Sequence, residues 1–341
     1  MLMVFCYRLR LLMMLTPTQL DQLVQAMPLL QFAGEVDEGW AKEPLPRAYL
    51  DAYQLDFYRH FAGLRHGFGA VDTGGFRIAT HYWIPPEARG TLVVVHGYYD
   101  HVGIFRHAIR FALEHQLAVL TFDLPGHGLS SGEQAAIDSF DQYGDVLRHL
   151  LQVARHQLPG PFLGFGQSTG ASVLLNYQWR FGEHSEAVRL EKTVLCAPLV
   201  LPCGWQWGRF AFYLCRPFLR RLARGSSRSS HDPAFTRFIQ SEDPLQSRYL
   251  SLKWVGAMAL WHDSVRCAGP LHLPVLVIQG TGDRTVDWRY NLKQLREKIP
   301  TAEIHLIPEA GHQLINESPE YRNQLLAIMS GWLFDGEAAG G

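Results

Sequence analysis

The chain has 341 residues, of which 47% are hydrophobic and 12% aromatic, so wholesale disorder is excluded and a large core is expected. A formal net charge of −1 argues against nucleic acid as the main partner. Five cysteines, an odd number without a C-x-x-C pair, favour reduced thiols in a cytoplasmic protein over a disulfide framework or a metal site.

The N-terminal region, residues 1–66, reads as an extension with helices. Residues 1–15 are apolar but too short to span a bilayer, and two arginines make them a poor signal peptide. They fit an interfacial anchor, a buried segment, or an extension upstream of a true start at Met14, which we favour. Helical spacing predicts a helix over 16–27, followed by a proline-containing linker and a short surface helix over 53–61.

From residue 67 the pattern is that of an α/β fold. Segments 68–72 and 76–84, joined by Thr-Gly-Gly, predict a β-hairpin. Short apolar runs then alternate with helical patterns. Strands are expected at 91–95, 118–122, 161–165, 193–197, 274–278 and 303–307, and helices at 103–115, 137–156, 288–298, 320–334 and directly after residue 168. This alternation predicts a doubly wound, mostly parallel sheet whose core comprises residues 67–197 and 274–336.

Residues 198–273 interrupt the alternation and show no good β pattern, so we expect an inserted cap of two or three helices over the active edge of the sheet. Between residues 203 and 268 there are ten cations and four acids, interleaved with aromatic residues. This composition suits an anionic lipid surface, and hence peripheral membrane contact, or an acyl substrate with a charged head. The alternative, which we favour, is that the aromatics pack on the sheet while the arginines are solvated.

The sequence Gly166-Gln167-Ser168-Thr169-Gly170 matches G-x-S-x-G between a predicted strand and a predicted helix. In this context the pattern is typical of a nucleophile elbow, which exposes the serine Oγ at the end of a strand. A plain Gly/Ser turn is the alternative, and the flanking elements favour the elbow.

A serine hydroxyl needs a base held in the correct tautomer. His312 follows the strand expected at 303–307 and Asp283 follows the strand expected at 274–278, so both lie at the carboxyl edge of the sheet with Ser168. The chain order serine, aspartate, histidine is that of the α/β-hydrolase triad. Asp287 is the rival acid and is placed to cap the following helix.

Two further histidines lie at the same edge, His96 and His127, but neither follows an acid on a later strand. The negative charge on an attacked carbonyl requires hydrogen-bond donors, which we assign to the backbone N–H groups of Thr169 and Tyr98.

Together these motifs resemble the α/β-hydrolase superfamily, and more narrowly its branch of monoacylglycerol lipases and bacterial lysophospholipases, often labelled serine aminopeptidase-like. The matching segments are HGYYDH (96–101), FDLPGHGLSSG (122–132), GFGQSTG (164–170), GTGDRTVD (280–287) and GHQLINE (311–317). The resemblance implies no metal and no organic cofactor. The chain departs from the usual pattern at several positions: Tyr99, Asp100, Pro125, Gln167, Thr169 and Gln313.

The sequence thus predicts a serine hydrolase that cleaves carboxylic esters of a small-molecule lipid, of monoacylglycerol or lysophospholipid type. An amidase or aminopeptidase on the same scaffold would need an anionic site for a free amine, for which Asp232, Glu242 and Asp243 are candidates. Acyl transfer and a non-catalytic binding protein are further alternatives.

Overall fold

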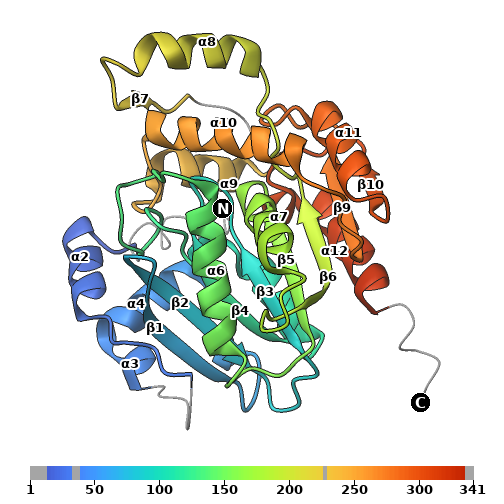
Figure 1. Ribbon diagram of the computed structural model, residues 1–341. Coiled ribbons are helices and arrows are strands. Elements are labelled where there is room, and N and C mark those ends of the chain that lie inside the picture. Colours follow the sequence, from blue (N-terminus) through green and yellow to red (C-terminus); the bar gives the residue numbers. More distant parts are fainter. Residues whose placement is uncertain (1–13, 33–38, 226–228, 335–341) are drawn as a thin grey trace.

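The computed structural model describes residues 14–32, 39–225 and 229–334. Its centre is an eight-stranded sheet with the order β1-β2-β4-β3-β5-β6-β9-β10 (Figure 1). The strands are β1 Arg65–Thr73, β2 Phe76–Ile84, β3 Thr91–Val95, β4 Ala118–Phe122, β5 Phe162–Gln167, β6 Leu190–Cys196, β9 Val275–Gly280 and β10 Glu303–Ile307. β2 pairs antiparallel with β1 and β4, and all other neighbours are parallel. The predicted hairpin and mostly parallel sheet are therefore confirmed.

Helices cover both faces of this sheet, which is why the central strands are apolar on both sides. One core cluster joins residues of α6 (Phe140–Ala154), α7 (Thr169–Phe181) and α11 (Trp288–Lys298), such as Leu147, Leu174 and Leu292. The other joins residues of α4 (Pro44–Tyr53), α5 (Arg106–Glu114) and α12 (Pro319–Phe334), such as Leu50, Ile109 and Leu325. The core also contains the 3₁₀ turns η2 Val102–Ile104 and η4 Leu314–Asn316.

After its first helix, the N-terminal region differs from the prediction. Helix α2, Pro17–Ala26, begins as expected at Thr16, whose Oγ1 accepts a hydrogen bond from the Gln19 N–H. The expected helix over 53–61 is wrong: the chain forms α3 Gly39–Lys42 and α4 Pro44–Tyr53, and then only the 3₁₀ turn η1 Phe57–Arg59. Prolines suit the first turn of a helix, where N–H groups have no intrahelical partner. Residues 1–13, and with them the choice of start, lie outside the described residues.

Between β6 and β9 the chain forms the inserted segment, which we take as residues 198–273. Its helices are α8 Trp205–Cys215, α9 Pro233–Arg237, the π-helical turn η3 Phe238–Glu242 and α10 Leu252–Cys267. The two or three helices predicted for this segment are therefore present. It also contains two short antiparallel strands that the sequence does not predict, β7 Arg221–Ala223 and β8 Tyr249–Ser251. Strands of three residues are too short to show an alternating pattern. The division of the chain into domains at residues 66, 197 and 273 stays a prediction.

Helix α10 attaches the inserted segment to the core. The Trp261 ring stacks on that of Phe140 in α6, with centroids 5.6 Å apart, and its Nε1–H donates to the Leu199 carbonyl at 3.0 Å. Helix α8 lies at the top of Figure 1, beyond α10 and remote from the sheet. The inserted segment is therefore anchored through α10 and leaves α8 largely exposed.

Candidate active site

Ser168 lies in the turn between β5 and α7, in the strained conformation of φ 55° and ψ −114°. A non-glycine residue adopts this region only where the surroundings hold it. Here the Ser168 N–H donates to the Cys196 carbonyl at 2.8 Å, and its own carbonyl accepts from the Leu199 N–H at 3.3 Å. The strained backbone is consistent with the predicted elbow.

His312 and Asp283 meet at the same edge of the sheet. The His312 Nδ1 lies 2.7 Å from the Asp283 Oδ2, and the two side chains are 6% and 0% exposed. The other carboxylate oxygen accepts from the Thr285 N–H at 2.7 Å. The rival acid, Asp287, instead caps α11 by accepting from the Tyr290 N–H. The imidazole is therefore oriented by Asp283, which leaves its Nε2 available as a base.

Each member of this pair shifts the pKa of the other. Burial alone would lower the pKa of His312, but the Asp283 carboxylate outweighs burial and raises that pKa above its ordinary value. Burial would likewise raise the pKa of Asp283, but His312 and the backbone donors lower it. The carboxylate is thus held in its charged form and favours a protonated imidazole.

Gln167 joins the elbow to the loop that carries His312. Its Nε2 donates to the His312 carbonyl at 2.6 Å, from a wholly buried position. The residue that precedes Ser168 is therefore hydrogen-bonded directly to His312. Sequence reasoning noted Gln167 only as a departure from the family pattern and gave it no role.

The loop of residues 96–101 after β3, called here the 96–101 loop, passes close to the elbow. A Cβ placed on Gly97 would lie 3.3 Å from the Ser168 Cβ and 3.2 Å from the Gln167 carbonyl oxygen. Next to Gly97, the Tyr98 ring stacks on that of Trp254 in α10, with centroids 3.8 Å apart. Thr169 begins α7, so its N–H lies at a helix N-terminus that favours negative charge.

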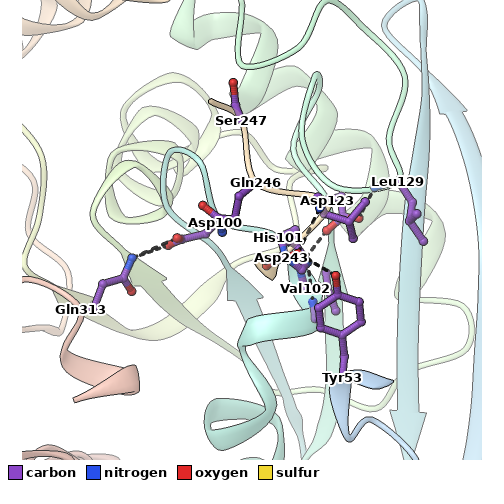
Figure 2. A network of polar contacts seen from close by, with 12 residues as sticks. Tyr53, Asp100, His101, Val102, Asp123, Leu129, Asp243, Gln246, Ser247 and Gln313 are labelled. Carbon is purple, nitrogen blue, oxygen red and sulfur yellow. Dashed lines mark hydrogen bonds and ion pairs between the residues drawn. The ribbon is translucent and has the colours of Figure 1, made fainter. Parts of the chain in front are cut away.

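The loop that carries His312 also contacts the 96–101 loop, through a hydrogen bond that sequence reasoning missed. The Gln313 Nε2 donates to both carboxylate oxygens of Asp100 at 3.0 Å, and Figure 2 shows the two side chains facing one another. Burial raises the pKa of Asp100. Both residues depart from the family pattern, and their pairing, 213 residues apart in sequence, is visible only in the fold.

The two other histidines of this edge have local backbone partners. The His96 Nε2 accepts from the Leu124 N–H at 2.8 Å, and the His127 Nδ1 lies 2.9 Å from the Pro125 carbonyl. Burial lowers the pKa of both, that of His127 to about 4. They are neutral supports of the loops, and within the part of the chain that the structure describes neither forms an ion pair with a carboxylate.

A cavity of about 650 Å³ lies beside the His312 loop. It is lined by Ser230, His231, Thr281, Gly282, Arg284, Glu309 and Gly311. Ser168 is not among these residues, so the cavity is separate from the elbow. In residues 14–32, 39–225 and 229–334, no group of three His, Cys, Asp or Glu side chains is placed to hold a metal ion.

Comparison with known families identifies this architecture. The family model described as serine aminopeptidase, S33, matches residues 86–319. The chain belongs to this family. The match begins before β3, ends after the His312 loop, and so covers all the predicted site residues.

Two of the curated relatives are lipases at low identity. The chain is 26% identical to a monoacylglycerol lipase of Mycolicibacterium smegmatis over 278 residues, which cover 79% of this chain and 96% of the relative. It is 27% identical to the monoglyceride lipase of Homo sapiens over 279 residues, which cover 80% of this chain and 91% of the relative.

Solved structures of similar proteins give the fold. A soluble variant of monoglyceride lipase from Saccharomyces cerevisiae superposes with a TM-score of 0.66 at 19% identity, covering 77% of this chain and 93% of the other. The monoacylglycerol lipase of Paleococcus ferrophilus gives 0.65 at 21% identity, covering 76% and 98%. The chain therefore has the α/β-hydrolase fold, as its motifs predicted. Family, relatives and fold are those of lipase- and esterase-type carboxylic ester hydrolases, and the predicted enzyme class is confirmed at this level.

Proposed function

We propose that the protein hydrolyses carboxylic esters of lipid type, of the monoacylglycerol or lysophospholipid class, through an acyl-enzyme on Ser168. The observation that carries this proposal is the buried 2.7 Å pair of His312 and Asp283, set at the same sheet edge as a strained serine turn. The lipid class rests on the relatives, which are named as monoacylglycerol and monoglyceride lipases.

The chemistry runs in two similar half-reactions. The Ser168 Oγ attacks the acyl carbonyl carbon while the His312 Nε2 takes its proton, and Asp283 stabilises the imidazolium. The Tyr98 and Thr169 N–H groups donate to the oxyanion. The tetrahedral intermediate expels the alcohol, which receives the proton from His312. A water molecule then attacks the ester carbon of the acyl-enzyme and gives a proton to the imidazole. The bond between this carbon and the Ser168 Oγ breaks, the Oγ takes the proton back from His312, and the fatty acid is released.

The contacts of two acids weaken the aminopeptidase alternative. Asp243 is 0% exposed and accepts hydrogen bonds within the protein, and Asp232 caps α9 through the Ala234 N–H. Burial thus closes Asp243 to a free amine, and Asp232 already serves as a helix cap. Acyl transfer would use the same acyl-enzyme. It would be detected as the formation of a new ester when a second alcohol is added to the reaction.

The test is covalent labelling combined with turnover. A fluorophosphonate probe should label the wild type and not Ser168→Ala, and hydrolysis should disappear with the label. Ser264→Ala, which removes an exposed hydroxyl of α10, is the matched control and should keep both. Activity should rise with acyl chain length and extend to monoacylglycerol or lysophospholipid. A sharp optimum at acetate or butyrate would refute the lipid class, and labelling of Ser168→Ala would refute the nucleophile.

We further propose that a cytoplasmic form of the protein contacts membranes at their periphery through α8. Large apolar side chains on and after this helix are exposed: Trp207 81%, Phe210 68% and Phe218 83%. Arginines are interleaved with them, which favours an anionic bilayer surface. Among the described ranges, no helix combines the length and hydrophobicity needed to cross a bilayer.

Vesicle binding tests this contact. The wild type should sediment with vesicles that contain anionic lipid and less with neutral ones. The double variant Trp207→Ser and Phe218→Ser should lose this binding, whereas Leu306→Ser, at an exposed apolar residue of β10, should keep it. Equal and negligible binding of the wild type to both vesicles would refute the proposal.

A further inference from the structure

Asp243, from the inserted segment, is buried against the 96–101 loop (Figure 2). Its Oδ2 lies 2.8 Å from the His101 Nε2, and both side chains are 0% exposed. Its Oδ1 accepts from the Tyr53 hydroxyl at 2.8 Å and from the Leu245 N–H at 3.0 Å. One carboxylate thus joins the inserted segment, the N-terminal helix α4 and the loop after β3.

The hydrogen-bond partners fix where the protons are. The His101 Nδ1 accepts from the Gly103 N–H at 3.2 Å, so the ring hydrogen is on Nε2 and is donated to Asp243. All three groups that face the carboxylate are then donors, which requires an unprotonated Asp243. Burial would raise the pKa of Asp243, but His101 and the other donors lower it.

The 96–101 loop needs such restraints because its position decides the geometry at the elbow. A Cβ on Gly97 would lie 3.3 Å from the Ser168 Cβ, so the loop backbone passes close to the elbow. Tyr98, the next residue, carries the N–H that we assign to the oxyanion. Beyond His101, the Asp123 carboxylate accepts from the Val102 N–H at 2.7 Å and fastens the loop to the end of β4. Asp243 supplies the corresponding restraint from the inserted segment.

We propose that Asp243 is a positioning residue, which holds His101 and thereby keeps the Tyr98 N–H directed at the oxyanion. The oxyanion site is then complete only when the inserted segment is docked. This inference rests on the proposed ester hydrolysis for its catalytic consequence, although the restraint on the loop can be measured without it.

The variant Asp243→Asn tests the restraint with little change in volume. An asparagine offers one acceptor oxygen and one NH₂ group to three donors, so one donor always faces a donor. If the NH₂ faces His101, the ring must move its proton to Nδ1, which then faces the Gly103 N–H. We expect kcat to fall by roughly 10- to 100-fold, less than the complete loss of an oxyanion donor, with KM changed by less than about twofold.

Tyr53→Phe is the matched control because it removes a donor to the other oxygen of the same carboxylate and leaves the His101 bond in place. It should lower the melting temperature, as Asp243→Asn does, but keep kcat within about twofold. The affinity for a trifluoromethyl ketone, which forms a tetrahedral adduct with a serine, should fall in Asp243→Asn in parallel with kcat and stay unchanged in Tyr53→Phe.

Hydrogen–deuterium exchange separates this inference from the proposed function. In Asp243→Asn, exchange should rise in residues 97–104 and not in the β3 and β5 strands, whether or not the wild type turns over an ester. Unchanged exchange in that peptide, or equal losses of kcat in Asp243→Asn and Tyr53→Phe, would overturn the positioning role. If Asp243→Asn does not fold, His101→Gln, which retains a donor and an acceptor, provides the same comparison and should show a smaller loss of kcat.

Discussion

At Gly170 the start of α7 leaves no room for a side chain against the end of β3, and a single added methyl group tests this packing. A Cβ on this glycine would lie 2.0 Å from the Val95 carbonyl oxygen and 2.7 Å from that of His96. Both oxygens belong to main chain at the end of β3, so rotation of a side chain cannot relieve the contact. Gly170→Ala must therefore displace the start of α7 from β3.

The size of this displacement determines the expected loss in the free energy of unfolding. Opening the 2.0 Å contact to an acceptable distance of about 3 Å requires a shift of about 1 Å. Overpacking of this kind costs about 3 kcal/mol, against which the better helix propensity of alanine returns about 1 kcal/mol. We expect a net loss of about 2 kcal/mol or more in the free energy of unfolding. A displacement of 1 Å at Ser168 should also lower kcat by about 100-fold.

Urea unfolding and ester turnover measure the two effects. Gly269→Ala is the control because a Cβ there has no heavy atom within 4 Å, and it should change the free energy of unfolding by less than about 0.5 kcal/mol. A Gly170→Ala protein with the stability and kcat of the wild type would show that α7 is not packed on β3 as described, and would refute the elbow geometry.

Two further predictions concern pH. Because Asp283 raises the pKa of His312 above 6.5, kcat/KM should rise with pH through an apparent pKa above that value. In Asp283→Asn, burial is opposed only by the smaller effect of Asp100, so this acid limb should move below 6.5 while kcat falls by about 10⁴-fold. An unmoved limb would contradict the pairing. Burial lowers the pKa of His66 to about 3, so its neutral form stabilises the fold fully above pH 6.5 and less as the pH falls towards 3. At pH 5 the free energy of unfolding is lower by about 2 kcal/mol for this reason. In His66→Gln, the free energy of unfolding measured in urea should therefore depend less steeply on pH.

The sheet and its strand ends could be predicted from the sequence because the signals are local. The strand β3, Thr91–Val95, is a continuous apolar run covered on both faces, and the helix α11, Trp288–Lys298, follows a capping aspartate. Once the strands are assigned, parallel order brings their carboxyl ends together. The nearness of Asp283 and His312 follows from that order alone.

The missed features depend on contacts between distant segments or on elements too short for a pattern. Helix α4, Pro44–Tyr53, contains two prolines and was taken for a linker, although proline is tolerated in the first turn. The partner of Asp243 lies 142 residues away, and no spacing rule connects a π-helical turn with a loop after β3. The sequence groups Asp243 with Asp232 and Glu242 as candidates for an anionic amine site, because the contacts with Tyr53 and His101 that bury it leave no local pattern.

Two buried carboxylates, Asp243 and Glu317, connect the inserted segment to loops of the candidate active site. Asp243 reaches from it to the 96–101 loop, and Glu317 in the core reaches towards it. The Glu317 carboxylate accepts from the Gly311 N–H at 2.6 Å, beside His312, and from the His231 N–H of the inserted segment at 2.7 Å. An unpaired buried carboxylate is costly, so each bond favours the docked arrangement. Docking of one segment therefore stabilises both loops on which the proposed chemistry depends, and a change that loosens it should affect the oxyanion and the base together.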